Sequence, residues 1–353
     1  MSNNYFDNLH DEVKAYFQIL SSEIPEFLYE YVEVPELRRL NGIGLSCGTD
    51  YTKLYRNRYF YSRLDHSVGV ALILWHFTKD KKQTIAGLLH DISTPAFSHV
   101  IDFMKGDAKT QETTEIATGE MIKKSTNLVR LLQKNDINIE EVDDYKLYPI
   151  ADNPSPQLSS DRLEYTFSSG LTMGDNRWNL NQIRKVYSDI RILTNESHLP
   201  ELGFNNLVSA EIFVNSSARL GTLFLSNENK LTLQLLADII KIMISNKVLT
   251  ESDLYTFSER EIIQKIEGCG DSSLQAIFEY FKSMTSVKRS DREIKDVYCI
   301  SVDVKRRFIN PLVCINGSIN RVNRVSSIAN SLIEEVIHFE DSKYAYIDIE
   351  PFR

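Results

Sequence analysis

The chain has few cysteines, no long hydrophobic run and no excess of positive charge, and each absence excludes a class of protein. The four cysteines are Cys47, Cys269, Cys299 and Cys314. None stands in a C-x-x-C pair, so we expect reduced thiols and a cytoplasmic protein rather than a disulfide-bonded secreted domain. No run approaches the roughly 18 apolar residues that span a bilayer, and residues 1–5 lack a basic secretion signal. We therefore expect no membrane partner.

The charge balance is acidic, with 40 Lys and Arg against 49 Asp and Glu and a formal net charge of −9. Because binding along nucleic acid requires clustered Lys and Arg, this balance excludes an extended nucleic-acid surface, although a single nucleotide can still bind in a locally basic pocket. A basic cluster at Lys305–Arg307, with Arg321 and Arg324 nearby, is interpreted as solvated surface. An oligomer interface or a regulatory anion site is the alternative.

Phosphate-binding glycine loops are also missing. The chain has no G-x-x-x-x-G-K-[ST], no G-x-G-x-x-G and no G-x-S-x-G motif. The sequence therefore does not indicate a P-loop fold, a dinucleotide-binding fold or a serine hydrolase.

Helical periodicity dominates the chain up to about residue 285, and a β-branched pattern begins near residue 296. The sequence predicts a mainly α protein with a helical bundle over residues 1–285. Residues 286–353 are expected to form a small α+β appendage, which is compatible with assembly into a homo-oligomer. Within the bundle, residues 111–134, 138–150 and 179–194 are each expected to be helical.

Two imidazoles and two carboxylates on helical segments form the candidate functional site. They are His66, His90, Asp91 and Asp161. This mixed nitrogen and oxygen set suits one divalent transition metal, namely Mn²⁺, Fe²⁺, Co²⁺, Ni²⁺ or Zn²⁺, with Mg²⁺ as a further candidate. Arg63 lies three residues before His66 on the same helix face, where a guanidinium can hold a phosphate oxygen.

His90 and Asp91 end an almost wholly apolar segment, residues 82–91. A buried Asp there needs a cation or several hydrogen-bond donors. The alternative is a helix end whose His and Asp bond to the backbone, but an acidic residue opposes the helix dipole at that end. Asp161 alone would be an ordinary residue of a helix start introduced by Ser159 and Ser160.

Taken in order, these segments resemble the HD-domain metal-dependent phosphohydrolases over about residues 30–250. The matching segments are residues 63–70 (RLDHSVGV), 86–91 (AGLLHD), 97–102 (FSHVID) and 161–165 (DRLEY). Residues 34–40 (VPELRRL) resemble the segment that precedes the first His in the deoxynucleoside-triphosphate triphosphohydrolase branch. The resemblance implies an HD helical bundle and hydrolysis of a phosphoester.

The resemblance also implies roles for individual residues. His66, His90, Asp91 and Asp161 would be the metal ligands, and Arg63 would hold phosphate. Asp102 would orient the attacking water or support a ligand. Arg162 and Tyr165 would clamp or stack on a small phosphorylated ligand.

The chain departs from the triphosphohydrolase branch at its helper residues. Thr94 stands where that branch has a catalytic His, and the second helper His aligns with Gln111 or, alternatively, Thr114. Neither side chain can exchange a proton as imidazole does. Glu112 or Glu115 is therefore the expected proton donor.

The sugar- and phosphate-reading positions also differ. Ser169 stands where the branch has an Asp, Leu45 or Ser46 where it has a Gln, and Glu228 near the position of a phosphate-binding Arg. Losing one charged phosphate contact costs roughly 1.5–3 kcal/mol.

We therefore expect a metal-dependent phosphohydrolase of a nucleotide or another small phosphoester. The alternatives are a deoxynucleoside triphosphate triphosphohydrolase with substitute helpers and a catalytically silent nucleotide or metal sensor. A di-iron oxygenase is least favoured, because only His99 lies between the His-Asp pair and Asp161.

Overall fold

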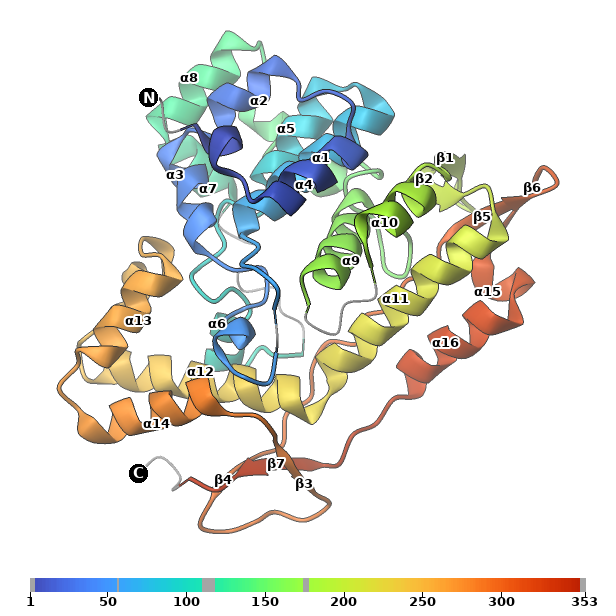
Figure 1. Ribbon diagram of the computed structural model, residues 1–353. Coiled ribbons are helices and arrows are strands. Elements are labelled where there is room, and N and C mark those ends of the chain that lie inside the picture. The colour runs from blue at the N-terminus through green and yellow to red at the C-terminus, as the bar shows by residue number, and fades with distance from the viewer. Residues whose placement is uncertain (1–3, 56, 110–117, 174–177, 350–353) are drawn as a thin grey trace.

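A computed structural model describes residues 4–55, 57–109, 118–173 and 178–349 (Figure 1). The protein is mainly helical, as the sequence predicts. The first ten helices are α1 (Asp11–Leu20), α2 (Glu26–Tyr31), α3 (Pro35–Arg38), α4 (Arg63–Thr78), α5 (Lys81–Leu89), α6 (Val100–Met104), α7 (Thr118–Lys124), α8 (Thr126–Lys134), α9 (Ser160–Thr172) and α10 (Leu180–Tyr187).

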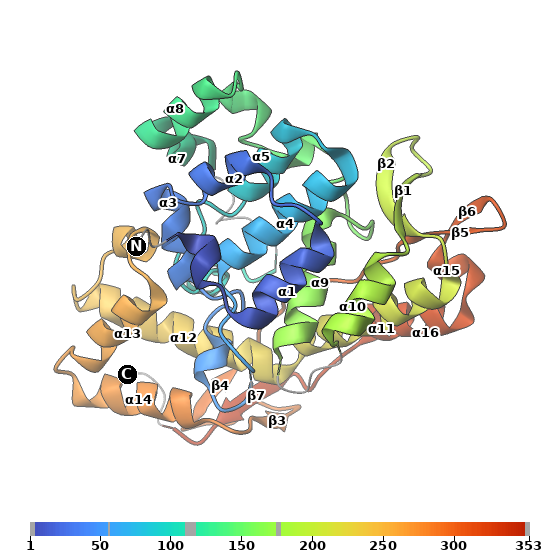
Figure 2. The same ribbon diagram turned by 45° about the horizontal axis from the view of Figure 1, so that its top comes forward.

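Helix α4 is the centre of this half of the molecule. Its residues from Arg63 to Leu74 are all buried, and it packs against α1, α5 and α9 (Figure 2). The helix begins with a reciprocal capping box between Ser62 and Asp65, and Tyr5 donates a hydrogen bond to Asp65 at 2.6 Å. Because this start is fixed on both sides, the residues of the first turn have a defined orientation.

The later helices form a second layer. They are α11 (Leu207–Leu225), α12 (Asn227–Ser245), α13 (Glu259–Glu267), α14 (Ser272–Ser283), α15 (Val322–Val325) and α16 (Ser327–His338). A second hydrophobic core joins α6, α12, α13 and α14, whereas α11 packs on α9, α10 and α16. The segment between α5 and α6 thus lies between the two cores.

Two small sheets complete the fold. One has the order β1 (Ile190–Thr194), β2 (Pro200–Phe204), β5 (Leu312–Ile315), β6 (Ser318–Arg321). Its β2–β5 pair is parallel, and the β1–β2 and β5–β6 pairs are antiparallel. The other is antiparallel, with the order β3 (Lys288–Ser290), β7 (Tyr344–Ile347), β4 (Tyr298–Ile300).

Two helical predictions are wrong in detail. Residues 190–194 form β1 instead of extending a helix, because Ile190 to Thr194 pair with β2 along their whole length. Residues 138–150 contain only short 3-10 turns, since the carboxylates of Glu141 and Asp144 accept hydrogen bonds from the nearby backbone amides of Asn138 and Lys146. Of the predicted helix 111–134, α7 and α8 account for residues 118–134, and residues 111–117 lie outside the described part.

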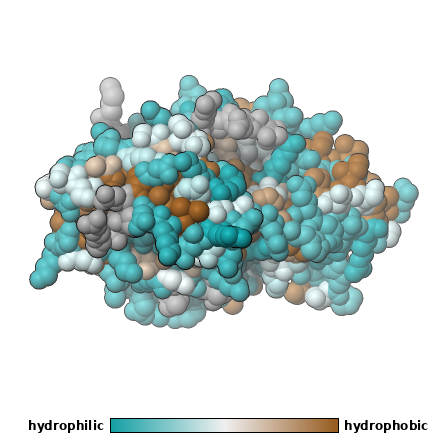
Figure 3. Space-filling model, turned by 90° about the horizontal axis from the view of Figure 1, so that it is seen from below, coloured by the Kyte–Doolittle hydropathy of each residue, from teal (hydrophilic) through white to brown (hydrophobic). Residues whose placement is uncertain are grey.

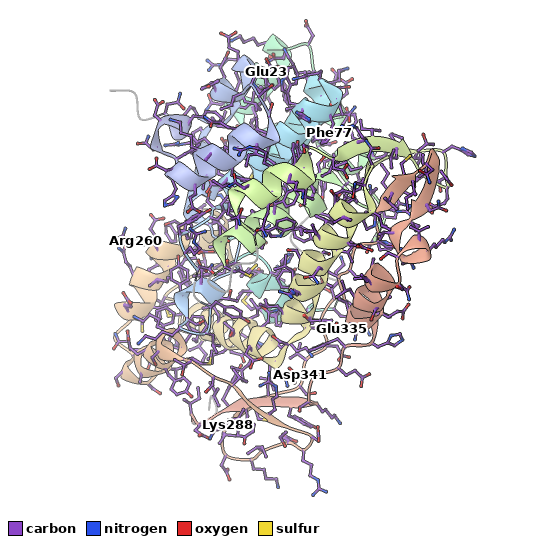
Figure 4. All side chains as sticks on the ribbon, turned by 45° about the vertical axis from the view of Figure 1, so that its right-hand side comes forward. Glu23, Phe77, Arg260, Lys288, Glu335 and Asp341 are labelled. Carbon is purple, nitrogen blue, oxygen red and sulfur yellow. The ribbon has the colours of Figure 1, made fainter. Side chains whose placement is uncertain are left out.

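The C-terminal segment is packed onto the helical bundle. Strand β5 extends the β1–β2 hairpin, and most buried hydrophobic residues beyond residue 286 belong to the same two large cores as the bundle, with Val336 in a small third cluster. Figure 4 shows Lys288 and Asp341 near the small antiparallel sheet and Glu23 and Phe77 at the opposite end of the molecule. The boundary at residues 285/286 stays a prediction.

Among the helices of the described residues, none combines the length and apolar character needed to cross a membrane. Seen from below, hydrophobic patches are separated by hydrophilic side chains (Figure 3).

Glu259, at the start of α13, connects the second core to the two loops that carry Gly44 and Phe97. It is completely buried and accepts a hydrogen bond from the backbone amide of Phe97 at 3.2 Å. A Cβ added to Gly44 would lie 3.3 Å from its other carboxylate oxygen. Burial, reinforced by the charge of Asp50, raises the pKa of Glu259 to about 8.

We predict that Glu259→Gln makes the protein more stable than the parent above pH 8 and that the difference narrows toward pH 5. The unfolded carboxyl ionises near pH 4.5 and the folded one near pH 8, so the folded state holds an extra proton between these values. Stability therefore falls as the pH rises through this window, by up to about 1.4 kcal/mol per pH unit, and Gln removes this contribution. Denaturant unfolding of both proteins from pH 5 to 9 measures it, and parallel stability profiles would contradict it.

Candidate metal centre

The four predicted ligands come together from three helices. His66 lies on α4, His90 and Asp91 follow the end of α5, and Asp161 lies in the first turn of α9. The Nε2 atom of His66 is 3.1 Å from Oδ1 of Asp161, and that of His90 is 3.9 Å from the same oxygen. Oδ2 of Asp91 lies 3.9 Å from Nε2 of His66 and 3.6 Å from Nε2 of His90.

Two glycines allow this close approach of the helices. A Cβ on Gly69 of α4 would lie 2.8 Å from the side chain of Glu164 on α9. A Cβ on Gly87 of α5 would lie 2.3 Å from the side chain of Leu74 on α4. A larger residue at either position would force the side chain of Glu164 or of Leu74 to shift.

Glu164 is a site residue to which the sequence reasoning gave no role. It is completely buried on α9, and its carboxylate pairs with Nδ1 of His66. Tyr61 donates to the same carboxylate at 2.6 Å, and Ser168 at 3.1 Å. Its position three residues after Asp161 places both carboxylates on one helix face, which is the signal that could have revealed it.

Both imidazoles are oriented to present Nε2 to the centre. Nδ1 of His66 is held by Glu164, and Nδ1 of His90 donates to the backbone carbonyl of Gly87 at 2.7 Å. Such partners on the far nitrogen fix the tautomer and are typical of metal-ligating histidines. The ring of Tyr145 packs on His90, with 4.9 Å between ring centroids.

The electrostatics favour a bound cation. Burial alone would lower the pKa of His66, but Glu164 and Asp161 outweigh it and raise this pKa to about 10. Burial works against ionisation of the two aspartates as well. The hydrogen bond from His66 nevertheless lowers the pKa of Asp161 to about 2, and Arg63 holds that of Asp91 well below its usual range. The donor set therefore combines ionised carboxylates with oriented imidazoles and fits a divalent metal.

A cavity of about 210 Å³ opens beside these ligands. Its lining includes apolar side chains from several elements: Leu45, Met173, Leu223, Phe224, Leu233 and Val304. Tyr145 and Tyr165 add two aromatic rings, and Ser46 and Ser169 lie in the wall as well. The cavity thus offers an organic ligand an apolar surface next to the metal ligands.

Arg63 and Thr94 both line the cavity and both contact Asp91. Nη1 of Arg63 is 2.8 Å from Oδ2 of Asp91, and its Nε donates to Ser98 at 3.0 Å. The hydroxyl of Thr94 donates to Oδ1 of Asp91 at 3.0 Å. The threonine at the position of the expected helper His therefore orients a ligand carboxylate.

Asp102 does not line the cavity among the described residues but lies behind a residue that does. It is completely buried, and its Oδ2 is 2.9 Å from Nδ1 of His99, which lines the cavity. Burial lowers the pKa of His99, the charges of Arg307 and Arg63 lower it further, and Asp102 counteracts them. The two residues form a carboxylate–imidazole pair, a unit that the i, i+3 spacing could have indicated.

The other residues predicted to act in the site lie in different places. Tyr165 lines the cavity, whereas Arg162 is turned to the loop before α9, where it lies 3.1 Å from Asp152 and 2.8 Å from Oδ1 of Asn153. Glu228 binds Arg289 at 2.6 Å and is absent from the described lining. Glu112 and Glu115, with the alternatives Gln111 and Thr114, lie outside the described residues.

The chain is similar in sequence and in fold to several known proteins. The HD domain family matches residues 63–147. The metal-dependent phosphohydrolase cns2 of Cordyceps militaris is 31% identical over 183 residues, which are 52% of this chain and 50% of that protein. This chain thus spans about half the length of cns2. The uncharacterized protein YdhJ of Bacillus subtilis (strain 168) is 25% identical over 326 residues, which are 91% of this chain and 94% of that protein.

Two solved structures share the fold. A hypothetical protein from Aquifex aeolicus superposes with a TM-score of 0.61 and 16% identity, covering 92% of this chain and 93% of the other. A phosphohydrolase from Bacteroides thetaiotaomicron gives a TM-score of 0.60 and 14% identity, covering 92% and 96%. At such identities these likenesses concern the fold alone.

We predict that Glu164→Gln weakens divalent metal binding about 10–100-fold, because the neutral amide no longer fixes the tautomer and basicity of His66. Calorimetric titration of the metal-free protein with Mn²⁺ measures the change. Ser168→Ala is the matched control, since it removes one hydrogen bond to the same carboxylate and leaves its charge. Equal metal affinities of the Gln variant and the parent would contradict the role of Glu164.

Proposed function

We propose that this chain, which carries an HD domain of the metal-dependent phosphohydrolase superfamily, hydrolyses a phosphoester of a nucleotide or another small phosphorylated molecule. The observation that supports it most is the convergence of two oriented imidazoles and two ionised carboxylates beside a cavity. The name of cns2 supports the reaction class. The match covers half of cns2, and we therefore include the activity named for cns2 in this proposal.

His66, His90, Asp91 and Asp161 would hold one divalent ion, Mn²⁺, Fe²⁺, Co²⁺, Ni²⁺, Zn²⁺ or Mg²⁺. When bound, it supplies Lewis-acid activation of the phosphoryl group and the attacking water. Arg63 keeps Asp91 ionised through its 2.8 Å contact. Its guanidinium would also stabilise the charge on the phosphoryl oxygens. Thr94 fixes the other oxygen of Asp91.

The His99–Asp102 pair is the proposed proton-transfer unit. His99 lines the cavity, and Asp102 holds its Nδ1 at 2.9 Å, so the other ring nitrogen is the one available to exchange a proton with the leaving oxygen. Burial lowers the pKa of His99, so near pH 7 the ring is mostly neutral and this nitrogen takes up a proton before it passes one to the leaving oxygen. Glu112 and Glu115 remain the alternative donors. Tyr165 and the apolar wall would bind the organic part of the substrate.

Two alternative functions remain. A deoxynucleoside triphosphate triphosphohydrolase would have to read its sugar with Ser46 and Ser169, which line the cavity but carry shorter side chains than the Gln and Asp of that branch. A silent sensor would bind nucleotide without turnover, and the His99–Asp102 pair argues for catalysis instead. Cytoplasmic location and homo-oligomeric assembly stay predictions.

We predict that His90→Ala and Asp161→Ala each lose bound metal and phosphohydrolase activity together, because each removes a ligand atom. Plasma mass spectrometry gives the metal content. Phosphate, pyrophosphate and tripolyphosphate release from mono-, di- and triphosphate nucleotides under each metal gives the activity. Full metal content and full activity in both variants would overturn the assignment, and release of tripolyphosphate by the parent would establish the triphosphohydrolase alternative.

We predict that His99→Gln keeps its metal but lowers kcat about 100-fold or more, because Gln cannot exchange a proton. Asp102→Asn should lower kcat less, since it disturbs only the orientation of the imidazole. A pH profile of kcat/KM that loses one limb in the Gln variant supports the role of His99. An unchanged kcat with unchanged metal content would move proton transfer to another residue.

A further inference from the structure

Residues 301–311, here called the crossing segment, connect β4 to β5 without regular secondary structure. The segment runs beside α11 from the small antiparallel sheet to the β1–β2–β5–β6 sheet (Figure 1). Two of its backbone hydrogen bonds run to distant parts of the chain, from Lys305 N to Ala108 O at 3.3 Å and from Asn310 N to Pro156 O at 2.8 Å. The segment therefore joins the region after α6 to the loop before α9.

Gly221 of α11 sets the depth at which the crossing segment lies. A Cβ on this glycine would approach the carbonyl oxygen of Arg307 to 2.7 Å and a methyl group of Val336 to 2.9 Å. Only a residue without a side chain lets the backbone of Arg307 lie this close to the helix. The position of residue 307 is thus built into the packing of α11.

Successive side chains of the segment face different surroundings. Lys305 and Arg307 line the cavity that holds the metal ligands. Arg306, between them, turns away and donates to the carbonyls of Val336 at 2.6 Å and Phe339 at 2.9 Å, at the end of α16. Lys305 and Arg307 thus bring two cations to the cavity wall, whereas the residue between them binds the end of α16.

The charges in the cavity wall indicate what these cations bind. Among the described residues that line the cavity, the carboxylates are Asp91 and Asp161, and the permanently positive side chains are Arg63, Lys305 and Arg307. A divalent ion would balance the two aspartates, and Arg63 already contacts Asp91. The charge of Arg307 acts on two residues of the cavity wall: it adds to the effect of burial in lowering the pKa of His99, and it partly offsets the burial that raises the pKa of Tyr165. The crossing segment therefore adds positive charge beside the metal-ligand carboxylates.

We propose that Lys305 and Arg307 bind a second anionic group of the substrate, beyond the phosphoryl group that is hydrolysed. This deepens and rests on the proposed function. It assigns the substrate to small molecules with two separate phosphoryl groups, such as a nucleoside bisphosphate or diphosphate, rather than to simple monophosphates. Arg63 serves the reacting phosphate, and the crossing segment serves the other.

The test compares adenosine 3′,5′-bisphosphate with adenosine 5′-monophosphate, using Lys305→Gln, Arg307→Gln and the double variant. Arg306→Gln is the matched control, because it removes the same charge from the adjacent residue that faces away. The double variant should raise KM for the bisphosphate about 10–100-fold, change KM for the monophosphate less than about threefold and leave kcat nearly unchanged. Gly221→Ala, checked for intact folding by its unfolding midpoint, should act in the same direction as the double variant.

Equal losses on both compounds would assign the two cations to the reacting phosphate and overturn the inference, as would an equal effect of Arg306→Gln. Calorimetric binding of the same two compounds to metal-loaded protein separates this inference from the proposed function. Suppose that the parent hydrolyses neither compound but binds the bisphosphate at least about tenfold more tightly than the monophosphate. If the double variant loses this difference in affinity and the Arg306→Gln variant keeps it, the second anion site is supported and the proposed hydrolysis is not. A parent that binds neither compound, or both equally, contradicts the site.

Discussion

The buried pair of Glu164 and His66 is the interaction on which the site depends. An ionised carboxylate in the interior carries a desolvation penalty of roughly several kcal/mol unless it is paired and hydrogen-bonded. Here Tyr61, Ser168 and the His66 ring supply the partners, and Gly69 gives the carboxylate room between α4 and α9. The same contact that satisfies Glu164 orients His66, so helix packing and ligand geometry are determined together.

The cavity, by contrast, depends on residues far from one another in the chain. The ligands lie between His66 and Asp161, whereas Lys305 and Arg307 reach the same cavity through a segment held by Ala108, Pro156 and the surface of Gly221. A C-terminal part that shares the two large cores of the bundle can place side chains in the site as firmly as the helices do. Bundle and appendage therefore act as one structure around the ligand.

The sequence was sufficient to predict the mainly helical fold, which the structure confirms. It was also sufficient to select four candidate ligands that the structure brings together. An apolar helix that ends in His-Asp and an acidic residue at a helix start are local patterns that can be seen in the sequence. It was insufficient where pairing partners lie elsewhere. Residues 190–194 became a strand through β2, and Arg162 turned to its own loop instead of the cavity. Lys305 and Arg307 were interpreted as solvated surface, with an oligomer interface or a regulatory anion site as the alternative, since no local signal reports that residues so far apart in the chain as His66 and Lys305 share a cavity.

Thr94 explains how the metal ligands and the helpers can change independently. At this position a hydroxyl that bonds Asp91 stabilises the ligand geometry, while an imidazole would serve proton transfer. Although Thr94 supports Asp91 and supplies no imidazole, the cavity is also lined by His99, whose Nδ1 pairs with Asp102. The candidate metal ligands are held by buried contacts, whereas much of the cavity wall comes from other elements, so residues of the wall can differ without moving these ligands.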